Sequence, residues 1–271
     1  MTSLAEVTFC VLDLETTGCD AGIDAITEIG ALTVRGGEVL GTYSTLVHAR
    51  QPVPTVVALL TGISDSMLAD APPIEQVLPS LAEFLRGTVL VGHNVRFDAR
   101  FLDAALTRHG YPPLDCPLVD TLPLARTLLR DDAPNCRLTT LAAALSLEAT
   151  PTHRAFADAR ATTELLHVLI ERATGWGTYT LDDLTQLPRL GSHPYARKLP
   201  MTNGLARAPG VYLFHGAGDR VIHVGQADDV RRAVRAYFAS RDRRRIAPLL
   251  RETQRVSAIE TDDPLVADVL E

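Results

Sequence analysis

The sequence predicts an α/β protein with a mixed sheet of about five strands flanked by helices, followed by a smaller α/β module. Two observations predict this class. Three strand-like stretches come first, and helix-like and strand-like stretches then alternate as far as residue 175. From residue 209 the sequence pattern changes: short β-branched and aromatic runs precede an arginine-rich stretch with helical spacing. We therefore expect a first domain at 1–175, a linker at 176–208 and a second module at 209–271.

The first half of the domain is expected to contribute three strands. An apolar run with β-branched and aromatic character at 9–12 predicts a buried strand. Alternation predicts strands at 27–35 and 38–47, and Gly36-Gly37 between them is a two-residue hairpin signal. Prolines then break the chain before a short helix at 56–60. Apolar residues at helical spacing predict the next helix at 74–86.

The second half is expected to alternate. In order, we expect a short buried strand at 88–91, a helix at 95–109, a strand at 116–119, helices near 121–130 and 138–145, and a long helix at 155–173. Residues 175–208 contain Gly, Pro, Ser and His without sustained periodicity, which is why we expect a linker there.

Length and composition are those of an ordinary globular protein. With 271 residues the chain has room for one large domain or two smaller ones. No apolar run approaches the ~20 residues that span a bilayer, and no signal peptide is visible at the N-terminus. The 4 cysteines are scattered, which fits a reducing compartment rather than a disulfide framework. We expect a cytoplasmic protein with no membrane partner.

The net charge of -7 by itself argues against a nucleic-acid partner. Its distribution is more informative, because the first 208 residues hold 16 basic and 23 acidic residues and so carry all of the excess negative charge. An enzyme that holds metal ions with a carboxylate cluster shows this bias and still binds phosphate, since the metals reverse the local sign. Net charge therefore excludes neither class.

Several acidic residues sit at the ends of predicted elements. Asp13 and Glu15 end the first strand, where residues two apart point to the same face. Asp98 and Asp158 fall in the first turns of two helices, on stripes that face inward, and His153 precedes Asp158 in a loop. Taken singly, each has a purely structural interpretation. Asp13 and Glu15 fit a solvated acidic turn, Asp98 and Asp158 fit favourable charges at helix N-termini, and His153 fits a surface histidine. Taken together, they form a set.

That set carries a resemblance to a known family. The motifs are D-L-E-T-T-G at 13–18, H-N-V-R-F-D at 93–98 and H-R-A-F-A-D at 153–158. They resemble the three motifs of the DEDDh 3′–5′ exonucleases, which include the proofreading epsilon subunit of bacterial DNA polymerase III, ribonuclease T and oligoribonuclease. The resemblance covers 5–175 and implies a ribonuclease H-like fold. It further implies a metal-binding set of Asp13, Glu15, Asp98 and Asp158, with His153 as the general base.

Phosphodiester hydrolysis explains why the family needs these residue types. Two divalent ions roughly 3.5–4 Å apart can clamp the attacking and leaving oxygens. Hard oxygen ligands suit Mg²⁺ or Mn²⁺, and a histidine with an ordinary pKa of about 6.5 can take the proton of the attacking water. Contacts to the terminal nucleotide are expected from Leu14, Thr16, Thr17 and Asn94. For Leu14 a place in the core is an equal alternative.

The second module resembles the GIY-YIG nuclease domain of the bacterial excision-repair endonuclease over 209–271. The first motif is present as Gly210-Val211-Tyr212. His223 stands where the family has its second tyrosine, and Ala233 stands where its catalytic arginine is expected. The catalytic glutamate would fall at about Glu271, where the chain stops before such a domain normally closes. We therefore expect a degenerate module without nuclease activity.

An arginine run in this module is compatible with nucleic-acid contact. Arg231, Arg232 and Arg235, with more arginines at 241–245 and two aromatic residues nearby, fit phosphate contact and base stacking. A solvated helix face is an equally good interpretation.

The leading functional hypothesis is a metal-dependent 3′–5′ exonuclease that releases nucleoside 5′-monophosphates from single-stranded or frayed DNA ends. By the resemblance it would act in proofreading or repair at the bacterial nucleoid, beside a polymerase or repair-complex partner. One alternative is a 3′–5′ exoribonuclease, and a comparison of DNA and RNA ends separates the two. The other is a non-catalytic scaffold or nucleic-acid-binding subunit, which would have no need of all five motif residues.

Overall fold

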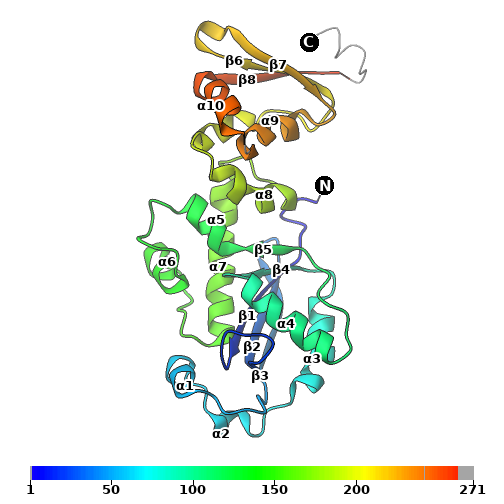
Figure 1. The fold of residues 1–271 in the computed structure, drawn as a ribbon, viewed down its shortest axis with the longest axis vertical. Helices are drawn as coiled ribbons and strands as arrows, with labels where there is room; N and C mark the ends of the chain where they lie inside the picture. The colour runs from blue at the N-terminus through cyan, green and yellow to red at the C-terminus, as the bar shows by residue number, and fades with distance from the viewer. Residues whose placement is uncertain (1, 241, 262–271) are drawn as a thin grey trace. The chain divides into compact units, whose positions relative to one another are not determined.

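The structure, a computed structural model, describes residues 2–240 and 242–261 (Figure 1). The chain divides into two compact units, each described by itself. The first unit comprises Met1–Arg172 and Tyr179–Thr185, and the second comprises Ala173–Thr178 and Gln186–Glu271.

The first unit is built on a 5-stranded sheet with the strand order β3-β2-β1-β4-β5. Its strands are β1 (Phe9–Thr16), β2 (Ile26–Arg35), β3 (Glu38–Leu46), β4 (Val89–Gly92) and β5 (Leu118–Asp120). The β1–β2 and β2–β3 pairs are antiparallel, whereas the β1–β4 and β4–β5 pairs are parallel. The predicted mixed five-stranded sheet is therefore confirmed.

Helices flank the strands of the first unit. They are α1 (Thr55–Thr61), α2 (Asp65–Leu68), α3 (Ile74–Leu85), α4 (Arg96–Arg108), α5 (Thr121–Leu128), α6 (Leu138–Leu145) and α7 (Ala155–Thr174). Figure 1 shows α7 as the long green helix that runs alongside the strands. The expected helices lie within a few residues of these bounds, and α2, a single turn, was not expected.

The two faces of the sheet have different roles. Cys10, Leu12 and Leu14 belong to one apolar cluster with buried residues of α3 and α4. Because side chains alternate along a strand, Asp13 and Glu15 point to the opposite face. In the β1–β2 register Asp13 lies opposite Gly30 and Glu15 lies opposite Glu28. At the end of β1, one face thus packs into this apolar cluster and the other collects polar groups, whereas Phe9 and Val11, earlier on that second face, are buried.

The second unit is a 3-stranded antiparallel sheet in the order β7-β6-β8. Its strands are β6 (Gly210–His215), β7 (Val221–Ala227) and β8 (Arg255–Glu260), and its helices include α9 (Val230–Ala239) and α10 (Arg243–Glu252). Short 3₁₀ turns, η1 (Ala196–Thr202) and η2 (Ala217–Asp219), complete it. This agrees with the predicted small α/β module.

The segment expected to be a linker is folded. It contains α8 (Leu181–Gly191) and η1, and its Leu190 and Leu199 are buried in the core of the second unit, with Trp176 packed against them. Pro188 inside α8 and the 3₁₀ turn interrupt the helical periodicity, which is why the sequence pattern indicated a linker. In the described part of the chain, no helix is both long enough and apolar enough to cross a membrane.

Candidate active site

The candidate site is assembled from β1, α4 and the start of α7. Asp13 and Glu15 lie near the end of β1, and both are half-buried. Asp98 lies in the first turn of α4 and is only 4% exposed. Its Oδ1 accepts the backbone N–H of Leu14 at 3.1 Å, so the start of α4 is fastened to the end of β1. The sheet thereby holds three carboxylates of two elements in one place.

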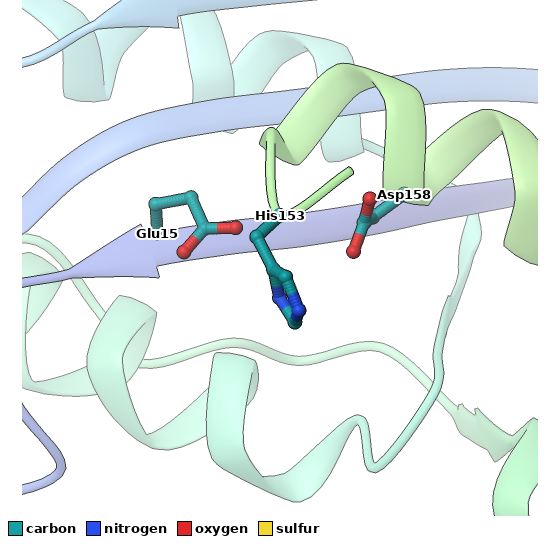
Figure 2. A group of neighbouring side chains, drawn as sticks. All are labelled: Glu15, His153 and Asp158. Atoms are coloured by element: carbon teal, nitrogen blue, oxygen red, sulfur yellow. The ribbon is translucent and has the colours of Figure 1, made fainter. Parts of the chain in front are cut away.

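The start of α7 supplies the remaining groups. Asp158 is buried in the first turn of α7, and its Oδ1 accepts the N–H of Thr152 at 2.8 Å. This contact closes the loop in which His153 lies exposed, with a left-handed backbone (φ 55°) that non-glycine residues seldom adopt. Figure 2 shows the carboxylates of Glu15 and Asp158 on either side of the His153 ring. Ligand atoms of these three residues lie within 4.8 Å of one another.

The carboxylates oppose one another electrostatically. Burial, followed by repulsion from Asp98 and Asp158, raises the pKa of Asp13 well above its usual range. Burial, followed by repulsion from Asp158, raises the pKa of Glu15 to about 8. Burial likewise raises the pKa of Asp98 to about 8. The cluster therefore resists full ionisation unless a cation shares the site.

The donor set fits a hard divalent cation. Carboxylate oxygens of Asp13, Glu15, Asp98 and Asp158 are the ligands that Mg²⁺ and Mn²⁺ prefer, and His153 adds an imidazole at the rim. A divalent charge would also relieve the repulsion that keeps these groups protonated. The crowding of carboxylates that is costly in the absence of a cation becomes favourable in its presence.

The residues expected to contact substrate have different surroundings. Asn94 is exposed at the end of β4, and its left-handed backbone (φ 78°) is held by a 3.0 Å bond from its N–H to Asp120. Thr16 and Thr17 are buried. The hydroxyl of Thr16 donates to the carbonyl of Gly18, and the hydroxyl of Thr17 accepts from the N–H of Ala25 and from the side-chain amide of Gln51. The side chain of Leu14 is 5% exposed within the apolar cluster, which favours the core alternative.

The structure corrects the expectation for two arginines of α9. Arg231 and Arg235 are 5% and 4% exposed. Arg231 donates to the carbonyls of Gly177 and Asn203, and Arg235 donates to the carbonyl of Trp176. They hold the backbone of their own unit and do not form a surface for nucleic acid. Arg232, one residue along the helix, is exposed.

The second unit carries a hydrogen-bonded ring cluster at the GIY-YIG positions. The hydroxyl of Tyr237 lies 3.0 Å from that of Tyr212 and 2.6 Å from Nε2 of His223. Ala233 packs against the core of the unit and offers no group for phosphate. Glu271, where the family's glutamate was expected, lies outside the described residues.

Sequence reasoning missed one pair of charged residues. Glu28 is a buried acid within the apolar strand β2, and Arg154 belongs to the third motif. The guanidinium of Arg154 donates to both carboxylate oxygens of Glu28. An acid inside a run such as T-E-I-G-A-L was the available signal, because buried carboxylates require a partner.

Comparison with known proteins follows the two units. A family model described as "Exonuclease" matches residues 10–166, and a model described as "UvrC-like GIY-YIG domain" matches residues 208–271. A Mycobacterium tuberculosis protein whose name describes a bifunctional exonuclease/endonuclease is 43% identical over 278 residues, covering 99% of this chain and 43% of that protein. A PolC-type DNA polymerase III of Bacillus cereus is 39% identical over 163 residues, covering 60% of this chain and 11% of the polymerase. The chain thus spans less than half the length of these relatives.

Solved structures share the fold. Exonuclease X, in complex with 5′ overhanging duplex DNA, has a TM-score of 0.52 at 24% identity and covers 66% of this chain and 99% of that one. Escherichia coli Exonuclease I, in complex with a dA16 oligonucleotide, has a TM-score of 0.58 at 20% identity and covers 77% of this chain and 48% of that one. At these identities the likeness establishes the fold alone.

Proposed function

The chain belongs to the exonuclease family, and from this premise we propose that it hydrolyses nucleic acid from the 3′ end with the help of divalent cations. The observation that carries the proposal is the convergence of Glu15, His153 and Asp158, with ligand atoms within 4.8 Å of one another. Asp13 and Asp98 belong to the same carboxylate set, because Asp13 is repelled by Asp98 as well as by Glu15 and Asp158. A solvated acidic turn would not require this convergence.

The metal-binding residues in this proposal are Asp13, Glu15, Asp98 and Asp158, and the cofactor is a pair of Mg²⁺ or Mn²⁺ ions. When bound, such ions stabilise negative charge on the attacking and leaving oxygens of an in-line displacement. The bonds from Leu14 to Asp98 and from Thr152 to Asp158 hold two of the carboxylates in place before any ion arrives. Such preorganisation lowers the cost of assembling the site.

In this proposal His153 is the general base, which accepts a proton from the attacking water. Water attacks the phosphorus of the last phosphodiester, and the imidazole accepts a proton of that water. The bond from phosphorus to the 3′-oxygen breaks, and this oxygen takes up a proton from solvent to become the 3′-hydroxyl of the shortened strand. The ring is exposed at the rim of the carboxylate cluster, where both water and a chain end can reach it. Histidine is the side chain that most often acts as a general base in enzymes. The products are a nucleoside 5′-monophosphate and a strand shortened by one residue.

We propose single-stranded or frayed DNA as the substrate, in proofreading or repair beside a polymerase or repair complex. Support comes from relatives: Exonuclease X and Exonuclease I were solved with DNA, and several matched proteins are PolC-type DNA polymerases. The second unit, in which Ala233 and His223 replace the family's arginine and tyrosine, is proposed to hold substrate or partner without cleaving it.

The test is cleavage of a 5′-labelled single-stranded DNA and its RNA counterpart with Mg²⁺, Mn²⁺ or EDTA. A metal-dependent ladder that shortens from the 3′ end is expected, with DNA cut faster than RNA. Asp13→Ala should lower the rate by at least ~10³-fold with an unchanged circular dichroism spectrum, because the cations lose a central ligand. Full activity of that variant would refute the site, and faster RNA cleavage would identify an exoribonuclease.

A further inference from the structure

A second layer of charged contacts lies behind the proposed active site, on the face of β2. Glu28 is paired with Glu15 across the β1–β2 ladder, so it lies on the same face as the carboxylate cluster. It is 4% exposed, and a buried carboxylate is costly unless its oxygens are bonded. The hydrogen-bond partners of Glu28 therefore indicate its structural role.

Within the described residues, the hydrogen bonds to the Glu28 carboxylate come from two consecutive residues at the start of α7. Arg154 donates from Nη2 to Oε1 at 2.7 Å and from Nε to Oε2 at 3.0 Å, a two-point contact. The backbone N–H of Ala155 donates to Oε2 at 3.0 Å. Glu28 therefore acts as a helix cap supplied by another element, placed where the helix dipole favours negative charge.

The capped segment is the one that presents the proposed catalytic groups. His153 immediately precedes Arg154, and Asp158 lies one turn into the helix. The backbone N–H of Asp158 bonds to the carbonyl of Arg154 at 2.9 Å. The left-handed backbone of His153 is a sparsely populated conformation that its neighbours must hold in place.

The backbone of β2 is shaped to receive the same segment. A Cβ at Gly30, two residues along the strand from Glu28, would lie 2.2 Å from the backbone nitrogen of Phe156. The strand therefore contacts the first residues of α7 closely at Gly30 and bonds to them at Glu28. Two positions of one strand, two residues apart, thus contact the same six-residue segment, the third motif at 153–158.

We propose that Glu28 is a positioning residue that sets the place of His153, through Arg154 and the N-terminus of α7, relative to the carboxylates of β1. This rests on the proposed function, since it concerns the same reaction. Glu28 touches neither substrate nor the reacting atoms. Both of its oxygens are occupied by Arg154 and Ala155, which separates it from the four carboxylates proposed as metal ligands.

The first measurement is a double-mutant cycle on the steady-state kinetics of 3′-end cleavage. Glu28→Gln should lower kcat by about 10–100-fold with KM within threefold, because groups that orient an active-site residue have effects of this size. In a His153→Ala background the same change should have less than a threefold effect, since Glu28 acts through His153. Full effects in both backgrounds would overturn the proposal.

The second measurement does not depend on activity. Amide hydrogen exchange of residues 152–158 should quicken by at least about tenfold in Glu28→Gln, because the cap of the segment is weakened. Glu164→Gln is the matched control: Glu164 also lies on α7 and accepts backbone N–H groups, but from Glu148 and Ala149. It should quicken exchange there and leave 152–158 unchanged.

The two measurements separate the two proposals. If the wild-type protein cleaves nothing but Glu28→Gln loosens 152–158, the cap is real and the proposed function fails. If the wild type cleaves and Glu28→Gln leaves both kcat and the exchange of 152–158 unchanged, the positioning role is overturned while the proposed function stands.

Discussion

The electrostatic cost of placing carboxylates together is seen in the raised pKa values of three residues, Asp13, Glu15 and Asp98. Burial raises the pKa of Glu15 and Asp98 to about 8, and burial together with repulsion raises that of Asp13. The folded chain without metal therefore retains protons that the unfolded chain releases at neutral pH. Because metal ligation requires ionised carboxylates, we expect cation affinity to rise with pH and each binding event to release protons.

One prediction at the residue scale concerns the stability of the metal-free protein. The folded-state pKa of Asp98 lies above its ordinary value of 3.8, so the native state binds the extra proton, and stability falls as pH rises from about 4 to about 8. Asp98→Asn removes this penalty and keeps an oxygen that can accept the N–H of Leu14. It should raise the free energy of unfolding by about 1–3 kcal/mol at pH 8 and by little at pH 4.

Urea denaturation in EDTA at both pH values measures this effect. Asp70→Asn, at an exposed position, is the control and should change stability by less than about 0.5 kcal/mol. A destabilised Asp98→Asn at pH 8 would mean that the carboxylate contributes native contacts that outweigh its desolvation.

At the scale of elements, β2 is the strand that joins the sheet to the helix bearing the third motif. Its Glu28 bonds to the start of α7, and its Gly30 allows the backbones to approach. The opposite face of the sheet is filled by the apolar cluster shared with α3 and α4. Buried apolar residues also line the α7 face, among them Val11 and Leu165, so the contacts of Glu28 and Gly30 add to apolar packing there.

Gly30→Ala tests this arrangement. The added Cβ would meet the backbone of Phe156 at 2.2 Å, and backbone cannot move aside as a flexible side chain can. We expect a loss of about 3 kcal/mol in unfolding free energy and a fall in cleavage rate larger than stability explains, because the start of α7 is displaced. Gly204→Ala, whose Cβ meets nothing within 4 Å, should be close to neutral. Thermal denaturation and single-turnover cleavage measure both, and a neutral Gly30→Ala would contradict the close approach.

At the scale of the whole molecule, charge is divided between the units. The acidic excess belongs to the residues before 209, where the carboxylate cluster lies, while residues 209–271 contain 10 arginines and 10 acidic residues. Arg231 and Arg235 are buried and donate to backbone carbonyls of their own unit. Among the described residues of the arginine run, Arg232, Arg244 and Arg245 are exposed. Of the run's arginines that the structure describes, these three are the ones placed to contribute electrostatically to nucleic-acid binding.

A paired substitution tests that contribution. Each phosphate contact to a single strand adds about 0.7 to the slope of log K against log salt, so Arg232→Gln with Arg245→Gln should reduce the slope by up to about 1.4. Arg35→Gln with Arg86→Gln is the control, because both residues are exposed at the end of the sheet opposite the carboxylates. Fluorescence anisotropy with a labelled oligonucleotide, using Asp13→Ala protein to prevent cleavage, gives the slopes. Equal slopes in both pairs would identify the run as a solvated face.

The sequence by itself determined the fold class, the mixed sheet and the placement of Asp98 and Asp158 in first turns of helices, because strand alternation, helical periodicity and motif spacing are local properties. The tertiary structure decided which partners those residues have. Glu28 and Arg154 meet across 126 positions, and Arg231 reaches Gly177 across 54, so no local pattern indicates either contact. The folding of the expected linker likewise depends on a distant apolar core. Periodicity reports which face of an element is buried, whereas the identity of the partner is settled only when the chain brings distant segments together.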